Sequence, residues 1–254
     1  MTDIQLYIDN KVATLLLDPA DNKPATLDLD VLQKLNHCME EMEAQQPDVV
    51  LVKSTSERFF CVGANINALK DINEDTIENW VKEGHKVFNR LEDLPMPVIA
   101  VVNGYAMGGG LELAMACDLI FASENAKLAQ SEAGLGFIPG WGGTHRLPQR
   151  LGTSKAKYYF YSGKMLTATE AALVGLVDFC GTQAELEVEV QNFVQSIQSS
   201  NSNAIRQFKT ILNDQQRAAR NENADIEASR SISCLQDSDT KQRLHDFLNK
   251  KGKK

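Results

Sequence analysis

The sequence predicts an α/β fold in which much of the sheet is buried, followed by a mostly helical C-terminal part. Apolar runs typical of buried strands, at residues 49–52, 97–102 and 119–122, alternate with segments whose apolar residues have helical spacing. After Gly152 these runs give way to segments that are mostly compatible with helix. The chain has 254 residues, of which 43% are hydrophobic, so it can form a substantial core.

The first predicted elements are a hairpin and a helix. Residues 4–8 and 12–17 have strand character and flank a turn that we place at residues 9–10. Apolar residues recur at helical spacing from Leu29 onward and predict a helix. The β-branched run at residues 49–52 then predicts a strand, which completes a strand, helix and strand unit.

Two further units of this kind follow. The first has a strand at residues 59–62, a helix at about residues 75–90 and a buried strand at residues 97–102. The second has a helix that opens with the glycines at residues 108–110, followed by a strand at residues 119–122. Their repetition favours an α/β core.

The C-terminal part is predicted to be helical and continuous with the core. Thr167 and Glu170 have the spacing of a capping box. Further helices are predicted at residues 184–198, 203–220 and 224–250. Because no long Gly, Ser or Pro linker divides the chain, residues 196–254 are predicted to cover the core at 1–195 or a neighbouring subunit, not to fold as an independent domain.

Composition excludes several classes of function. A formal net charge of −8 and a pI near 5.1 disfavour nucleic-acid binding, which usually needs a basic surface. No signal peptide or membrane-spanning stretch is evident, so we expect a cytoplasmic protein without a membrane partner. The cysteines lack CxxC spacing, and we interpret them as reduced thiols: Cys38, Cys61, Cys117, Cys180 and Cys234.

Residues 103–118, NGYAMGGGLELAMACD, place three glycines at the start of an apolar helix. No Lys-Ser or Lys-Thr follows them and their spacing is not GxGxxG, so the run matches neither nucleotide-binding motif. Glycine lets backbone N–H groups approach a ligand closely, and the start of a helix favours negative charge. The run therefore fits an oxyanion site for acyl or thioester chemistry.

Two glutamates accompany this run. Glu112 lies among apolar neighbours, where a carboxylate costs several kcal/mol in order of magnitude unless it is paired, hydrated or protonated. It is therefore either a catalytic carboxylate or half of a structural ion pair. Glu132 lies in a loop-like segment, where a glutamate by itself is usually exposed. A strand and return between the two can bring them to one pocket, where they would act as base and acid.

Together, residues 58–70, 103–118 and 130–147 resemble the enoyl-CoA hydratase/isomerase superfamily, the crotonases. The resemblance covers nearly the whole chain. It implies a ββα superhelix core with a C-terminal helical region that forms trimers or dimers of trimers. The sequence is most similar to the enoyl-CoA hydratases, because both carboxylate positions hold glutamate.

The resemblance also implies a mechanism. The backbone N–H groups of Ala64 and Gly109 would bind the thioester oxygen of a 2-enoyl-CoA. Glu112 and Glu132 would hold a water over the C2=C3 double bond, Glu112 activating it for attack at C3 and Glu132 protonating C2. The N–H of Gly140 would help to hold the water.

The resemblance assigns coenzyme A contacts to a second set of residues. Arg58 matches a basic position near the coenzyme A phosphates, although a surface charge before a strand is an equal alternative. The terminal lysines at residues 250–254 are either a solvated end or further contacts to the anionic carrier. Coenzyme A arrives as part of the substrate, so we expect no separate cofactor and no metal. The coenzyme-binding segment comprises Arg58, Val62, Ala64 and Ile66.

The sequence departs from the family pattern at several positions. Asn65 stands where many relatives have Asp, and Trp141 stands where a small residue is common, a change that we attribute to packing. Residues 24–27 lack the usual Asn-Ala-Leu. Alternatives are therefore an enoyl-CoA isomerase, a methylglutaconyl-CoA hydratase, a decarboxylase of carrier-bound acyl groups, or a non-catalytic coenzyme A-binding protein.

Overall fold

The computed structural model describes residues 2–20 and 23–251, except for the side chains of Ile66, Lys250 and Lys251. Its strands are β1 Thr2–Asp9, β2 Val12–Pro19, β3 Val49–Ser54, β4 Phe59–Cys61, β5 Val98–Val102, β6 Tyr105–Met107, β7 Leu119–Ser123, β8 Lys127–Ala129, β9 Leu166–Thr167 and β10 Phe179–Gly181. They form a six-stranded sheet in the order β1-β2-β3-β5-β7-β10 and a four-stranded sheet in the order β4-β6-β8-β9.

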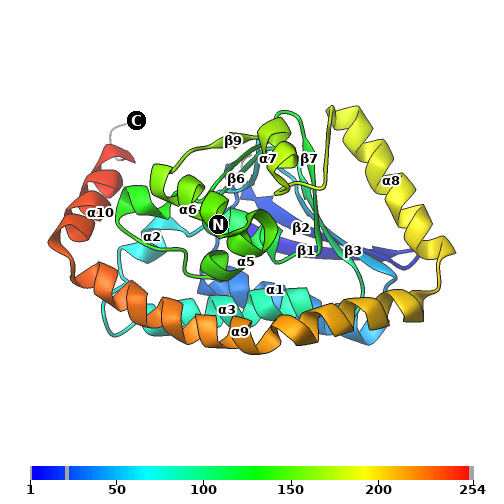
Figure 1. Cartoon of the computed structure of the whole chain (residues 1–254), viewed down its shortest axis with the longest axis horizontal. Coiled ribbons are helices and arrows are strands. Elements are labelled where there is room, and N and C mark those ends of the chain that lie inside the picture. The colour runs from blue at the N-terminus through cyan, green and yellow to red at the C-terminus, as the bar shows by residue number, and fades with distance from the viewer. Residues whose placement is uncertain (1, 21–22, 252–254) are drawn as a thin grey trace.

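The helices surround these two sheets (Figure 1). Their bounds are α1 Leu29–Gln45, α2 Ile66–Leu69, α3 Ile77–Asp93, α4 Gly109–Met115, α5 Gly143–Leu151, α6 Thr153–Ser162, α7 Ala168–Val174, α8 Gln183–Ser199, α9 Ser202–Gln236 and α10 Ser238–Lys251, with a 3-10 helix at Glu132–Leu135. The long helix α9 runs along one side of the molecule beside α3, and α10 turns back from its end (Figure 1).

Successive pairs of strands alternate between the two sheets. β3 lies in the larger sheet and β4 in the smaller one, and the pairs β5/β6 and β7/β8 repeat this division, each followed by helix. Strands β3, β5, β7 and β10 pair in parallel, as do β4, β6 and β8. The predicted α/β core of ββα units with a C-terminal helical region is therefore confirmed.

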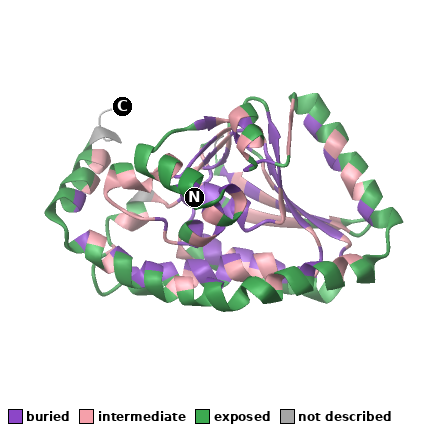
Figure 2. Ribbon diagram, viewed as in Figure 1, coloured by how far each residue is buried: buried purple, intermediate pink, exposed green. Residues whose placement is uncertain are grey.

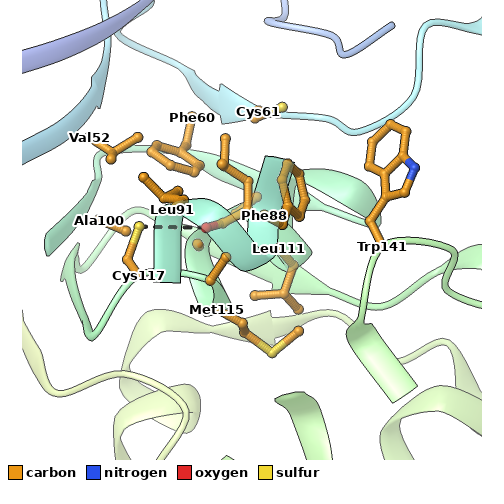
Figure 3. Packing of buried hydrophobic residues seen from close by; sticks show 14 of the residues in the cluster. Val52, Phe60, Cys61, Phe88, Leu91, Ala100, Leu111, Met115, Cys117 and Trp141 are labelled. Carbon is orange, nitrogen blue, oxygen red and sulfur yellow. Dashed lines mark hydrogen bonds between the residues drawn. The ribbon is translucent and has the colours of Figure 1, made fainter. Parts of the chain in front are cut away.

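The core lies between the two sheets and the helices α1, α3 and α4. Every residue of β5 and α4 is buried, which is why these segments are almost continuously apolar. Phe60, Phe88 and Leu111 belong to one buried hydrophobic cluster (Figure 3), and the thiol of Cys117 contacts the Leu113 carbonyl oxygen at 3.5 Å. Exposed residues lie mainly on the outer faces of α8, α9 and α10 (Figure 2).

The N-terminal hairpin differs from its prediction by one residue. Its turn is formed by Asn10 and Lys11, with φ angles of 47° and 61°, and Asp9 pairs with Val12 as the last residues of the strands. Two consecutive positive φ values are typical of the two-residue turn that matches the twist of a hairpin. The predicted turn at residues 9–10 was therefore wrong.

The predicted break in the C-terminal helices was also wrong. Residues 221–223 lie inside the continuous helix α9, which ends at Gln236. The polar sequence there continues the helix because neighbouring side chains bind other elements: Arg220 forms an ion pair with Asp93 of α3, and Asn223 Oδ1 accepts from the Thr144 hydroxyl of α5. The boundary that we placed after residue 195 falls inside α8.

No helix in the described part of the chain combines the length and apolar character needed to cross a bilayer.

Candidate active site

A cavity of about 810 Å³ lies where β4, α4 and the loop before α5 meet. The C-terminal helices α9 and α10 also contribute to its wall. It brings together the residues that the sequence analysis assigned to catalysis, although they are spread over three segments of the chain. The predicted residues that line it are Val62, Ala64, Gly109, Glu112, Glu132 and Gly140.

The segment around Ala64 is held by main-chain hydrogen bonds to residue 27. Leu27 N donates to Gly63 O at 2.9 Å, and Asn65 N donates to Leu27 O at 2.7 Å. These bonds use the groups on either side of Ala64, whose own N–H has no acceptor among the described residues. Gly63 has a φ of +84°, which turns the chain at this point. Ala64 N–H is therefore available to a ligand.

The second available N–H is that of Gly109, the first residue of α4, because no described residue accepts from it. The strands hold it close to the first: a Cβ added to Gly63 would lie 2.9 Å from Gly109 N. The next glycine is required by packing, because a Cβ on Gly110 would lie 2.0 Å from Cys61 O. The glycine run thus places a free amide beside the Ala64 segment.

Glu112 is only 2% exposed and lies one turn into α4. Its Oε1 accepts hydrogen bonds from Trp141 N and Gly143 N, both at 2.8 Å. Burial raises the pKa of Glu112 well above its usual range, and the negative charges of Glu132 and Glu227 raise it further. Its hydrogen-bond partners are backbone amides, so the structural ion pair that we considered is not formed among the described residues.

Glu132 begins the 3-10 helix and faces the start of α4. Its Oε1 accepts from Gln130 Nε2 at 2.6 Å, and a Cβ on Gly108 would lie 3.2 Å from the same oxygen. Its Oε2 is buried and has no hydrogen-bond partner among the described residues. Burial raises the pKa of Glu132 to about 7. The two carboxyl groups therefore share one cavity, and both bind protons more readily than ordinary glutamates.

Comparison with known proteins agrees with this geometry. The family model described as enoyl-CoA hydratase/isomerase matches residues 8–254. The chain belongs to the enoyl-CoA hydratase/isomerase family. The crotonyl-CoA hydratase of Syntrophomonas wolfei is 35% identical over 204 residues, 80% of this chain and 78% of that protein. The short-chain-enoyl-CoA hydratase of Clostridium acetobutylicum is 32% identical over 255 residues, 99% of this chain and 96% of that protein.

Solved structures show the same crotonase fold. An enoyl-CoA hydratase from Bacillus anthracis has a TM-score of 0.79 and 29% identity, with 98% of this chain and 96% of that chain covered. One from Bacillus halodurans has a TM-score of 0.89 over 96% of this chain and 99% of that chain. At 21% identity, the second likeness shows the fold alone.

Trp141 both packs in the core of this crotonase and lines its cavity. A Cβ on Gly84 would lie 2.0 Å from its indole ring, and one on Gly109 would lie 2.8 Å from the same ring. The indole N–H donates to Trp80 O at 3.2 Å. The ring is therefore wedged between α3 and the start of α4, which confirms the packing role that we expected and adds contact with the cavity.

Basic side chains lie both in the cavity wall of this crotonase and outside it. The Arg58 guanidinium lies 5.3 Å from the ring centroid of Phe59 and 5.9 Å from that of Tyr105, and Arg58 is not among the residues that line the cavity. Lys23 and Lys70 do line it. The positions of these two lysines at the cavity were not predicted, because isolated surface lysines form no sequence motif.

Other predicted contacts are only partly described. The backbone of Ile66 begins α2, but its side chain lies outside the described residues, as do the side chains of Lys250 and Lys251 and all of residues 252–254. Ser231 of α9 and Phe247 and Leu248 of α10 line the cavity and were also missed. They are more than one hundred residues away from the glycine run in sequence, and no local pattern connects them with it.

Proposed function

We propose that this crotonase is an enoyl-CoA hydratase, which adds water across the 2,3 double bond of a 2-enoyl-CoA thioester to give a 3-hydroxyacyl-CoA. The observation that supports it best is the pair of carboxyl groups, Glu112 and Glu132, in the cavity that also receives the free N–H groups of Ala64 and Gly109. The similarity to a crotonyl-CoA hydratase and to a short-chain-enoyl-CoA hydratase supports the same reaction.

In this proposal the thioester oxygen accepts hydrogen bonds from Ala64 N–H and Gly109 N–H. Attack of water at C3 moves the double-bond electrons toward the thioester, and negative charge develops on its oxygen. Backbone donors that are already in place stabilise this charge, and one such donor contributes a rate factor of roughly 100 to 1000. The hydrogen bonds to Leu27 and the packing of α4 hold both amides in position before the substrate arrives.

The two glutamates would share one proton. Because both are buried and close, the doubly ionised pair is disfavoured, and the pair titrates as a unit. We assign the ionised form to Glu112, whose Oε1 accepts two amide hydrogen bonds, and the protonated form to Glu132, whose Oε2 accepts none. The oxygen of the water bonds to C3 while Glu112 takes a proton from that water. Glu132 gives its own proton to C2. We place Gly140 N–H beside this water.

The coenzyme A part of the substrate needs positive charge at the mouth of the cavity, because it carries phosphates. Lys23 and Lys70 are the described cavity residues that offer it, and Arg58 is a further candidate. Hydration involves no net oxidation or reduction of the substrate. Two acid–base groups and two oxyanion donors are enough to catalyse it. We therefore propose neither a metal nor a redox cofactor.

We also propose that the protein is a homo-oligomer, a trimer or a hexamer. Large apolar side chains are exposed on the successive helices α6 and α7, including Tyr161 at 73% and Leu173 at 82%. Exposed apolar side chains of this size are typical of contact surfaces. Light scattering should give three or six times the chain mass, and a monomer alone would contradict this proposal.

The function is tested by supplying crotonyl-CoA and identifying the product. We expect loss of the conjugated thioester and formation of 3-hydroxybutyryl-CoA. A parallel assay with a 3-enoyl-CoA distinguishes an isomerase, which would form the 2-enoyl isomer faster than it forms the hydroxy product. Binding of enoyl thioesters across chain lengths without any turnover would overturn the hydratase assignment.

A further inference from the structure

Four consecutive amides at the start of α5 are shared between two buried carboxylates. Trp141 N and Gly143 N donate to Glu112, whereas Gly142 N donates to Glu227 at 2.9 Å and Thr144 N at 3.1 Å. Gly142, whose amide donates to Glu227 between two amides that donate to Glu112, has a φ of +98°. A single short segment is therefore fixed from one side by the proposed base and from the other by a residue of α9.

Glu227 is built into this position by further contacts. It is 1% exposed, and its Oε2 lies 2.7 Å from His85 Nε2 of α3. Its Oε1 accepts from the Thr144 hydroxyl at 2.5 Å and from Asn223 Nδ2 at 3.0 Å. Both carboxylate oxygens therefore have several donors, which is the condition for burying a charge at acceptable cost.

We propose that Glu227 is a positioning residue for hydration, which holds residues 141–144 so that the Trp141 and Gly143 amides keep the Glu112 carboxylate aimed at the water. This inference rests on the proposed function for its kinetic consequence. Glu227 lines no part of the described cavity, so it does not touch the substrate and acts on Glu112 from outside the cavity.

Glu227 should have a large effect on the rate of hydration for a residue that lies outside the cavity. A displacement of a reacting group by about 1 Å can cost about 100-fold in rate. Replacement of Glu227 by glutamine keeps the size of the side chain but replaces one acceptor oxygen with a donor nitrogen, which faces amides that are themselves donors. The 141–144 segment should therefore shift, and Glu112 with it.

The same replacement removes a negative charge, which gives a second readout. The groups facing Glu227 are His85 from α3, Glu112 from α4, Glu132 from the 3-10 helix and His145 from α5. The charge of Glu227 raises the pKa of Glu112. Without it, Glu112 should remain ionised to lower pH, and the acidic limb of kcat should move in that direction.

The test is steady-state hydration of crotonyl-CoA by the full-length Glu227→Gln variant. We expect kcat to fall about 10- to 100-fold, KM to change less than about threefold, and the acidic limb to move to lower pH. Lys209→Met is a matched control, because Lys209 is also a buried charge on α9, bonded to Asp118 and Met96 O. It should lower thermal stability but leave kcat and the acidic limb unchanged.

A milder variant guards against failure to fold. Thr144→Val removes the hydroxyl that donates to Glu227 and keeps the amide. We expect it to fold and to lose about two- to fivefold in kcat. Unchanged kcat and acidic limb in Glu227→Gln, or the same kinetic losses in Lys209→Met, would overturn the proposal and leave Glu227 a purely structural residue.

A measurement without turnover separates this inference from the proposed function. The chain has two tryptophans, so ¹⁵N-tryptophan labelling gives a simple spectrum in which the Trp141 amide signal reports Glu112. In Glu227→Gln the Trp141 signal should move and titrate at lower pH. An unchanged midpoint would overturn the inference, whereas a shifted midpoint in a protein without hydratase activity would contradict only the proposed function.

Discussion

The side-chain amide of Asn65 donates a 3.0 Å hydrogen bond to Oδ2 of Asp28. The other oxygen of Asp28 accepts from Val31 N and caps α1, while Asn65 Oδ1 accepts from Asn67 N and caps α2. The pair thus ties the segment of Ala64 to the start of α1. An amide donor at position 65 therefore suits a site that already contains the Asp28 carboxylate.

Asn65→Asp should place two carboxylates in contact and weaken this tie. We expect a loss of about 1 kcal/mol, which lowers the melting temperature by about 2 to 4 °C at pH 8, together with a lower kcat. The pair would bind a proton more tightly when folded than when unfolded, so the stability loss should shrink as pH falls. The double variant Asp28→Asn with Asn65→Asp restores a donor and an acceptor. Failure of the double variant to recover stability would contradict this account.

Gly84→Ala should destabilise the protein through Trp141. Alanine gains about 1 kcal/mol of helix propensity over glycine, but its Cβ would lie 2.0 Å from the indole ring, and overpacking costs about 1 to 3 kcal/mol or more. The clash should therefore dominate, and because the ring also touches Gly109, kcat should fall as well. Thermal unfolding and crotonyl-CoA kinetics measure both effects.

Gly134→Ala is the matched control for Gly84→Ala, because a Cβ at Gly134 meets no atom within 4 Å. We expect its melting temperature to stay within about 1 °C of the parent protein, since an open surface position contributes little. Equal stability of the two variants would show that the indole is not wedged as described.

Glu132→Gln should stabilise the protein at alkaline pH. The folded-state pKa of Glu132 is raised to about 7 from 4.5, so the folded protein binds the proton more tightly than the unfolded chain. The parent protein therefore loses stability as pH rises from about 4.5 to 7, and the glutamine variant lacks this loss. Its melting temperature should exceed that of the parent at pH 8 by about 7 to 14 °C and match it near pH 4.5. No difference between the two pH values would contradict the burial of this carboxyl group.

The sequence predicts well those features that are determined by residues close together in the chain. The glycine run and the apolar neighbours of Glu112 predict a helix start and a buried carboxylate, because both effects act within a few residues. The capping box of Thr167 and Glu170 is present as predicted, for the same reason. The strand runs likewise indicate burial on both faces, which the structure confirms for β5.

The features that the sequence does not predict depend on distant partners. In the sequence, Glu227 is one acidic residue in a polar helical segment. In the fold, α9 places it against His85 and the loop before α5. The continuity of α9 through residues 221–223 also depends on side chains that bind α3 and α5. Lys23 and Lys70 line the cavity because of the tertiary structure, which no local sequence pattern indicates.

The central claim is that Glu112 and Glu132 act together on one water. It is tested most directly by the kcat of Glu112→Gln and Glu132→Gln for crotonyl-CoA, with circular dichroism and binding of the product thioester as controls for folding and binding. We predict that each variant loses at least about 100-fold in kcat while it stays folded and binds the product with little change. Near wild-type turnover by both variants would contradict the account.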